Sequence, residues 1–135
     1  MTDYFNLNFE DEEIRKISNL GLAHLGDAVY ELMVRSWLCL HGKLTPGKLH
    51  KAALEYVAAP KQAAKMDILL PILTEEEITI FKRGRNASPH SYPKGATRRE
   101  YQIATGMESL FGWLYLQGRT DRLNELFELI MRGEE

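Results

Sequence analysis

The sequence predicts an all-α fold, a bundle of about six or seven helices in a single domain that spans residues 1–135. Apolar residues recur at helical spacing in successive segments, and Ser, Thr, Pro or Gly stands where such segments begin and end. No segment has the alternation of apolar and polar residues that is typical of a half-buried strand. A chain of 135 residues suits one hydrophobic core, so we expect one compact domain.

The first part of the chain is expected to hold a short helix and then a long one. Asp11 is placed to cap a short helix that runs to about Ile17, before Ser18 and Asn19 break it. The long helix follows and ends at Gly42, a C-cap candidate. Its apolar residues form one face for the core: Leu22, Leu25, Val29, Leu32 and Met33.

Prolines and hydroxyl side chains mark the middle helices. Thr45 is placed to cap a helix with Pro46 at its first position, where the missing N–H is tolerated. Pro60 opens the next helix, which ends near Pro71. Thr74, with a glutamate three residues later, has the pattern of a capping box and begins a further helix.

An exposed loop and two helices are expected to complete the chain. The loop runs from Arg83 to Ala96, because glycine, proline and serine concentrate there. Thr97 is placed to cap a long helix that Gly118 ends. The last helix runs from about Thr120 to Met131.

Composition and charge set limits on the class of protein. Hydrophobic residues at 44% and charged residues at 27% are ordinary for a folded protein. Cys39 is the only cysteine, which excludes an intramolecular disulfide and suggests a small buried hydrophobe. The sequence contains no recognisable signal peptide or membrane span, so we expect a cytoplasmic protein with no membrane partner.

Two acids stand in helices that are otherwise mostly apolar. Asp27 lies away from the apolar face of the long helix, and a solvated helix residue is the alternative interpretation. Glu108 is the only acid in its apolar helix, where Gly106 and Gly112 leave room for the Asp27 helix to pack. Two carboxylates from packed helices suit Mg²⁺, which usually takes one or two of them and keeps several waters. The spacing alone makes this a weak prediction.

The residues around both acids resemble a known family. The segment Leu25 to Val29 is similar to the signature helix of the ribonuclease III catalytic domain, and Glu108 to Leu116 is similar to its second acidic motif. The chain length, the run RGRNA at Arg83 to Ala87, and Tyr101 before Ala104 and Thr105 resemble Mini-ribonuclease III, which lacks the double-stranded-RNA-binding domain. This resemblance implies the helical fold of the ribonuclease III endonuclease domain.

The resemblance also implies an activity. It implies a metal-dependent endoribonuclease that cleaves double-stranded RNA, with Asp27 and Glu108 as catalytic residues that hold Mg²⁺, for which Mn²⁺ is a substitute. It further implies a homodimer, products with 5′-phosphate and 3′-hydroxyl ends, and maturation of the large-subunit (23S) ribosomal RNA precursor. A ribosomal protein is a further candidate partner.

The basic residues near the loop are candidates for RNA binding. The net charge of −2 conceals a stretch in which cations occur without acids between them. Arginine pairs bidentately with phosphate, although a solvated surface is the alternative interpretation. The candidates are Arg83, Arg85, Asn86, Lys94, Arg98 and Arg99, and Lys48, Lys51, Lys61 and Lys65 are a possible extension.

The main rival hypothesis is a non-catalytic helical module that binds structured RNA or a ribosomal protein. Longer ribonuclease III enzymes have glutamates at the positions of Leu20 and Ala23 and an aspartate at the position of Thr105. The loss of these acids favours the rival, whereas the retained pair opposes it. A purely structural helical adaptor leaves Glu108 and the basic stretch unexplained.

Overall fold

The computed structural model of the protein describes residues 1–42, 45–88, 92 and 94–132, and these residues form α-helices and one 3₁₀ turn, without a strand. The all-α prediction is therefore confirmed. The helices are α1 (Asp11–Arg15), α2 (Asn19–His41), α3 (Pro46–Val57), α4 (Ala59–Leu69), α5 (Glu75–Ala87), α6 (Arg98–Leu116) and α7 (Thr120–Met131), with the turn η1 (Leu70–Ile72) between α4 and α5.

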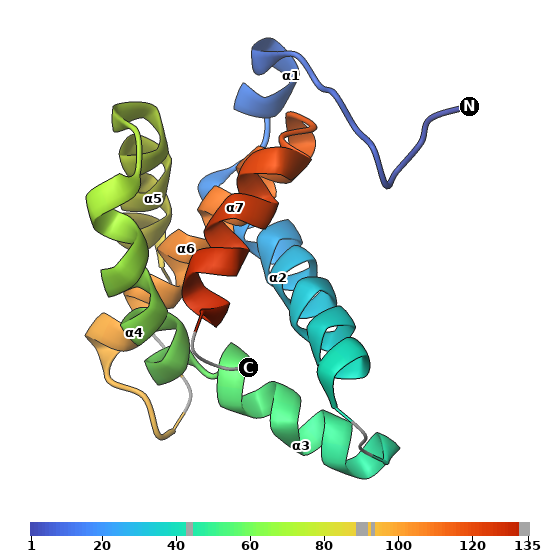
Figure 1. The fold of residues 1–135 in the computed structure, drawn as a ribbon. Helices are drawn as coiled ribbons and strands as arrows, with labels where there is room; N and C mark the ends of the chain where they lie inside the picture. The colour runs from blue at the N-terminus through green and yellow to red at the C-terminus, as the bar shows by residue number, and fades with distance from the viewer. Residues whose placement is uncertain (43–44, 89–91, 93, 133–135) are drawn as a thin grey trace.

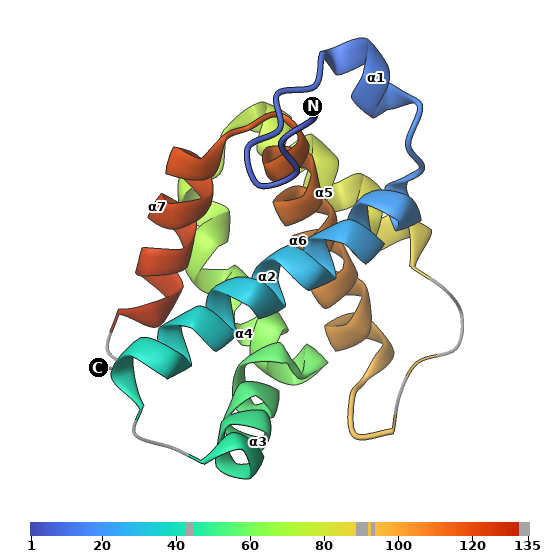
Figure 2. The same cartoon turned by 90° about the vertical axis from the view of Figure 1, so that its right-hand side faces the viewer.

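Helix α6 is the central element of the fold. Helix α2 crosses it on one side, and α4 and α5 pack against it from the other (Figures 1 and 2). From Ala104 to Leu114 every residue of α6 is buried except Glu108. An amphipathic surface helix has one apolar stripe, whereas a helix that is apolar on all sides lies inside a core. Glu108 therefore interrupts the most enclosed stretch of the chain.

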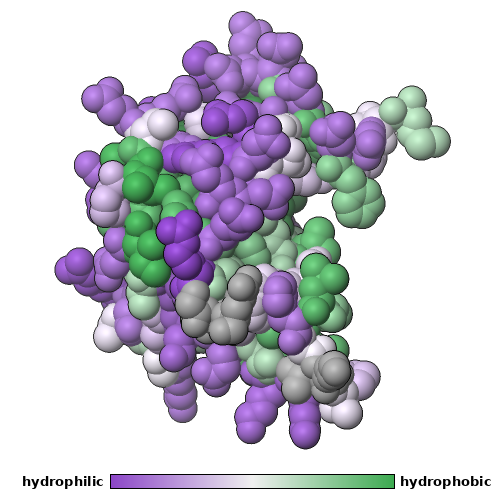
Figure 3. All heavy atoms as spheres, in the orientation of Figure 1, coloured by the Kyte–Doolittle hydropathy of each residue, from purple (hydrophilic) through white to green (hydrophobic). Residues whose placement is uncertain are grey.

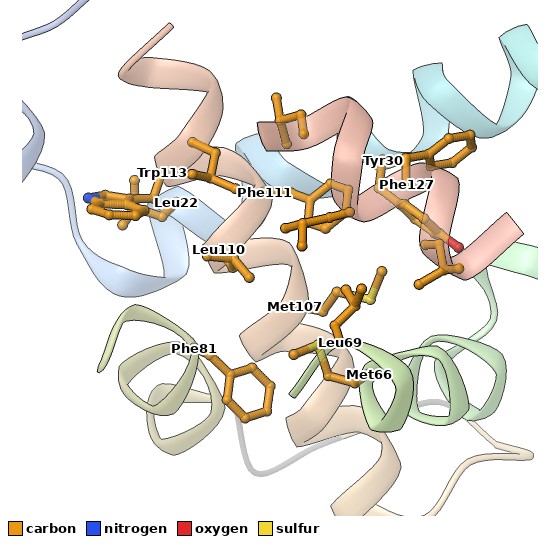
Figure 4. Packing of buried hydrophobic residues seen from close by; sticks show 14 of the residues in the cluster. Leu22, Tyr30, Met66, Leu69, Phe81, Met107, Leu110, Phe111, Trp113 and Phe127 are labelled. Carbon is orange, nitrogen blue, oxygen red and sulfur yellow. The ribbon is translucent and has the colours of Figure 1, made fainter. Parts of the chain in front are cut away.

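The core gathers around the middle of α6. Met107, Leu110 and Phe111 project from it towards the surrounding helices (Figure 4). Tyr30 of α2 meets Phe111 edge-on, with ring centroids 5.6 Å apart, and approaches Phe127 of α7 at 6.3 Å. Such edge-to-face pairs add to the stabilisation from burial. The Tyr30 hydroxyl donates to the Tyr56 carbonyl oxygen at 3.1 Å, which satisfies its polar end.

Glycines allow α2 and α6 to cross at very short range. A Cβ atom at Gly26 would lie 1.6 Å from the carbonyl oxygen of Glu108. A Cβ atom at Gly112 would lie 2.2 Å from the carbonyl oxygen of Leu22. Only glycine permits backbones to approach this closely. The crossing therefore fixes the peptide of Glu108 against the residue that precedes Asp27.

The crossing also sets which face of α2 is buried. The buried row follows a four-residue spacing through Leu22, Gly26, Tyr30, Val34 and Leu38. Leu32, which the sequence places on the core face, is 55% exposed, so that prediction is wrong. The reason is that the contact at Gly26 determines the rotation of the helix, and apolar spacing alone does not reveal such a contact.

Helix α5 is longer than expected, which corrects the predicted start of the loop. Arg83 to Ala87 belong to the helix, since a Cβ atom at Gly84 would lie 2.1 Å from the Ser109 Oγ of α6. Gly84 therefore serves close helix packing and does not break the helix. The helix ends at Ala87, and the next residue, Ser88, has φ −56° and ψ 139°, which suits the residue before a proline. Of the expected loop, residues 89–91 and 93 lie outside the described residues.

Three smaller expectations are also corrected. Gly106 faces α5, because its Cβ atom would lie 2.7 Å from the carbonyl oxygen of Phe81, and it does not contribute to the crossing with α2. Cys39 is exposed and not buried. Ser18 and Asn19 are expected only to break the short helix, but the Ser18 hydroxyl accepts from the Gly21 N–H at 2.9 Å and so caps α2, which begins at Asn19.

The surface carries apolar side chains on several separate elements. Figure 3 shows mainly hydrophilic atoms on one face and a hydrophobic group over the side formed by α4 and η1, where Ile68 and Ile72 are exposed. Leu20 and Leu32 are exposed on α2. Within the described residues, no helix has both the length and the apolar character needed to cross a membrane.

Candidate active site

The crossing of α2 and α6 brings Asp27 and Glu108 together. Asp27 lies close enough to Glu108 for its charge and its hydrogen-bonding to raise the pKa of the Glu108 carboxyl group. Asp27 is exposed and Glu108 is half-buried, and both line one cleft of about 450 Å³. Asp27 and Glu108 lie 81 positions apart in the sequence, so only the tertiary fold creates this pair.

Four parts of the chain build the cleft around the two acids. Helix α2 contributes Asp27 and Glu31, and α6 contributes one wall that ends at Glu108. The junction between α3 and α4 forms another wall, and the segment before α6 closes the rim. The residues from these last two parts are Leu54, Val57, Ala58, Ala59, Pro60, Gln62, Lys94, Gly95 and Ala96.

The environment of Glu108 disfavours its charged form. Burial raises the pKa of Glu108 to about 8, and the negative charge of Asp27 and the hydrogen bond with it act in the same direction. A hydrogen bond from Gln62 opposes this shift of the pKa. Near neutral pH, the Glu108 carboxyl group is therefore mostly protonated when no cation lies beside it.

The pair fits a hard divalent cation. Oxygen ligands suit Mg²⁺, and a cation beside two carboxylates would remove the repulsion that raises the pKa of Glu108. Glu31 also lines the cleft, but its carboxylate lies 3.5 Å from the Arg35 guanidinium. Among the described residues, no group of three or more His, Cys, Asp or Glu side chains is arranged to hold a metal ion. The donor set is thus two carboxylates, which leaves room for water in the coordination shell.

The positions of the auxiliary acids hold other side chains. Leu20 is exposed and Ala23 is buried. Thr105 is also buried, and its hydroxyl donates to the Tyr101 carbonyl oxygen at 2.9 Å and lies 3.3 Å from the Ser88 Oγ. The Thr105 hydroxyl therefore links the end of α5 to α6 and is not a member of the carboxylate pair.

Three of the candidate RNA-binding residues lie near the cleft or on the helix that leads to Glu108. Lys94 lines the cleft itself. Arg98 and Arg99 are exposed in the first turn of α6. Since α6 rises about 1.5 Å per residue, this turn lies roughly 15 Å along the helix from Glu108.

The other three candidates lie on α5. Arg83 lines a separate cleft of about 510 Å³ between α1, the start of α2 and α5. The Arg85 guanidinium lies 5.8 Å from the centroid of the Phe81 ring, and its Nε donates to the Asn86 Oδ1 at 3.3 Å. Asn86 is exposed. The structure therefore separates the six candidates into two groups.

Sequence reasoning missed Gln62 of α4. This side chain is 1% exposed and lines the cleft beside Glu108, whose pKa it lowers. Its Nε2 also donates to the Val57 carbonyl oxygen at 2.8 Å. A signal was present, since Gln62 shares helical spacing with Met66 and Leu69, both of them buried.

The chain is similar in sequence to one family of known proteins. Residues 20–119 match the family model described as the Ribonuclease III domain. A Mini-ribonuclease 3 from Enterococcus faecalis is 43% identical over 116 residues, which cover 84% of this chain and 88% of that protein. A Mini-ribonuclease 3 from Symbiobacterium thermophilum is 48% identical over 119 residues, which cover 85% and 92% of the two chains.

A solved structure has a similar fold. The crystal structure of a protein from Fusobacterium nucleatum superimposes with a TM-score of 0.83 at 31% sequence identity. The match covers 91% of this chain and 98% of that chain.

Proposed function

This chain belongs to the ribonuclease III family, which implies ribonuclease III-type cleavage of RNA, and we propose that it is a magnesium-dependent endoribonuclease specific for double-stranded RNA. The observation that carries the proposal is the contact between Asp27 and Glu108 in a cleft. Phosphodiester hydrolysis needs an activated water and a cation near the phosphate, and a carboxylate pair is a suitable anchor for such a cation.

The two acids act together in the proposed mechanism. Asp27 and Glu108 would hold Mg²⁺, which when bound supplies an activated water and stabilises the charge that develops on the phosphate. Glu108 would have to give up its proton for such an ion to bind, because a carboxyl group must be deprotonated to act as a ligand. The short crossing at Gly26 keeps both carboxylates at one point of the cleft.

The first turn of α6 supports binding of the RNA backbone. Arg98 and Arg99 stand at a helix N-terminus, where positive side chains are unfavourable for the helix dipole and a phosphate is favourable. Lys94 extends this positive group to the rim of the cleft. We expect these three cations to contact phosphates, because double-stranded RNA is recognised mainly through its shape and backbone. We propose that a second group contacts RNA farther from the cleft. Its members are Arg83, Arg85 and Asn86.

A homodimer completes the proposed enzyme. Leu20 and Leu32 are exposed on α2, the helix that carries Asp27. Apolar side chains on this helix support a two-fold contact between two copies of the chain. Such a dimer would present two carboxylate pairs to one duplex, one for each strand.

Finer features of the proposal rest on the resemblance to Mini-ribonuclease III. We propose that the products carry 5′-phosphate and 3′-hydroxyl ends and that Mn²⁺ replaces Mg²⁺. The proposed substrate is the precursor of 23S ribosomal RNA in the cytoplasm, and a ribosomal protein is a candidate partner.

The second candidate function is RNA binding without cleavage. The absence of acids at Leu20, Ala23 and Thr105 favours it, because fewer ligands remain for metal ions. The retained contact between Asp27 and Glu108 opposes it, since an RNA-binding module has no need of two adjacent carboxyl groups.

One assay separates the two functions. A long RNA duplex is incubated with the protein in Mg²⁺, in Mn²⁺, and in either metal with excess chelator. We expect cleavage with both metals and none with chelator, and ligation of the products tests their end groups. Binding of the duplex without cleavage in either metal would establish the non-catalytic module instead.

A further inference from the structure

Gln62 occupies an unusual position beside the carboxylate pair. It lies near the start of α4, in the row that continues through the buried residues Met66 and Leu69. Its Nε2 donates to the carbonyl oxygen of Val57, the last residue of α3, at 2.8 Å. The side chain also lines the same cleft as Glu108, close enough to lower the pKa of that carboxyl group. One amide thus connects the junction of α3 and α4 to an acid of the site.

These contacts determine the orientation of the amide. A carbonyl oxygen is only an acceptor, so the NH₂ group of Gln62 must face the carbonyl oxygen of Val57. Rotating the amide by half a turn would place its oxygen against this acceptor. The Oε1 of Gln62 is therefore left over, and within the described residues it has no hydrogen-bond partner.

A buried acceptor without a partner needs an explanation, because such groups are rare in folded proteins. Gln117 also has a buried Oε1 without a partner, but its Nε2 donates to Asp11 and it does not line the cleft. The unpaired oxygen alone therefore does not identify a site. Gln62 differs because its side chain lines the cleft that holds Asp27 and Glu108, where it acts on the pKa of Glu108.

We propose that Gln62 is a positioning residue for the metal pair: its NH₂ group holds the Glu108 carboxylate toward Asp27, and its Oε1 accepts a hydrogen bond from a water of the bound cation. This inference rests on the proposed function. Mg²⁺ keeps several of its waters when two carboxylates hold it, so donors for Oε1 enter the cleft with the ion. Groups that orient metal ligands typically change metal affinity by about 10-fold to 100-fold when they are removed.

The test measures Mn²⁺ binding in the absence of RNA, by calorimetry or by electron paramagnetic resonance. Gln62→Met keeps the length of the side chain and removes its polar atoms, and Gln117→Met is the matched control. We expect Gln62→Met to raise the dissociation constant for Mn²⁺ at least about 10-fold, and Gln117→Met to leave it within about twofold. Wild-type affinity in folded Gln62→Met would overturn the proposal.

A second variant covers the possibility that Gln62→Met does not fold. Gln62→Asn keeps the amide but withdraws it by one methylene, so it cannot reach Val57 and Glu108 together. We expect weaker Mn²⁺ binding here as well, and wild-type affinity would again overturn the proposal. Cleavage by either variant should recover when Mg²⁺ is raised, whereas a defect of folding alone would not respond to the metal concentration.

Asp27→Asn separates this inference from the proposed function. If Asp27→Asn binds Mn²⁺ as the wild type does, the metal pair itself is wrong and the proposed function fails with it. If Asp27→Asn loses Mn²⁺ while both Gln62 variants keep it, only the positioning role of Gln62 is wrong.

Discussion

At the scale of single residues, Glu108 combines burial with a neighbouring negative charge. Its pKa is raised to about 8 from an ordinary value of 4.5, mainly by burial and then by Asp27. A cation in the cleft would reverse this preference for the protonated form. The same residue therefore links the stability of the protein to pH and to metal.

We predict that the metal-free protein loses stability as pH rises. Between pH 4.5 and about 8, Glu108 holds a proton in the folded chain and has lost it in the unfolded chain. The folded state binds more protons in this range, so the free energy of unfolding falls with pH, by a few kcal/mol in total. Urea unfolding in chelator at pH 5, 6.5 and 8 measures this slope.

Two comparisons check whether Glu108 causes the pH dependence of the free energy of unfolding. Glu108→Gln cannot ionise at this position, so its stability should depend less on pH than that of the wild type. Mg²⁺ should restore the stability of the wild type at pH 8 and have little effect on Glu108→Gln. Equal slopes for the two proteins would assign the pH dependence to other groups.

The sequence reveals some of these residues better than others. Asp27 and Glu108 stand out because each is an acid within an apolar helix, and their contact agrees with the expected packing of the two helices, while their catalytic role stays a prediction. Gln62 does not stand out, because glutamine is common on exposed helix faces. Its spacing from Met66 and Leu69 indicates the buried face of α4, but its place beside Glu108 depends on the packing of α4 against α6, which local sequence does not encode.

At the scale of helices, the crossing of α2 and α6 positions the site. We predict that Gly26→Ala forces these helices apart, because the added Cβ atom would lie 1.6 Å from a backbone oxygen of Glu108. Overpacking of this kind costs about 1–3 kcal/mol, or more where backbone must move. Chemical unfolding and Mn²⁺ binding should both weaken.

Gly47→Ala is the matched control for the crossing. Gly47 lies in the first turn of α3, and a Cβ atom there would have no neighbour within 4 Å among the residues that the structure describes. This substitution should leave stability unchanged or raise it by up to about 1 kcal/mol. A Gly26→Ala protein that matches Gly47→Ala in stability and metal binding would show that the close crossing does not matter.

Helix ends show what local sequence can and cannot predict. Thr45, Thr74 and Thr97 each accept a backbone N–H at a helix start, as predicted, because capping depends on residues within one turn. The extension of α5 through Gly84 was not predictable, since its cause is contact with Ser109 in another helix. Tertiary contacts thus account for the errors in α2 and α5.

At the scale of the whole molecule, the basic residues near the cleft should govern RNA affinity. We predict that replacing Lys94, Arg98 and Arg99 with alanine weakens duplex binding and makes its salt dependence shallower, by about one unit of slope for each phosphate that is no longer neutralised. Titrations at several salt concentrations in the Asp27→Asn background measure this without cleavage.

An equal change of charge elsewhere provides the control. Lys48, Lys51 and Lys61 are exposed on α3 and α4, and their replacement with alanine should change the salt slope less. The opposite result, with a larger effect from these lysines, would move the RNA surface to α3 and α4.

The proposed assembly makes a prediction about mass. Light scattering at micromolar concentration should report about twice the chain mass of 15.5 kDa, because the exposed Leu20 and Leu32 of α2 support a contact between two copies. Leu32→Lys should shift the protein towards monomer by placing a charge in that contact. A monomeric wild type, with and without RNA, would contradict the model of two sites on one duplex.

Asp27 and Glu108 together are proposed to hold the catalytic metal. The most direct measurement compares cleavage of a long RNA duplex in Mg²⁺ by the wild type, Asp27→Asn and Glu108→Gln, with folding verified by circular dichroism. Each substitution keeps the shape of the side chain and removes a charged ligand, so the cleavage rate should fall by a factor on the order of 10³ or more while duplex binding persists. Cleavage at a rate near that of the wild type by either folded variant would contradict the claim.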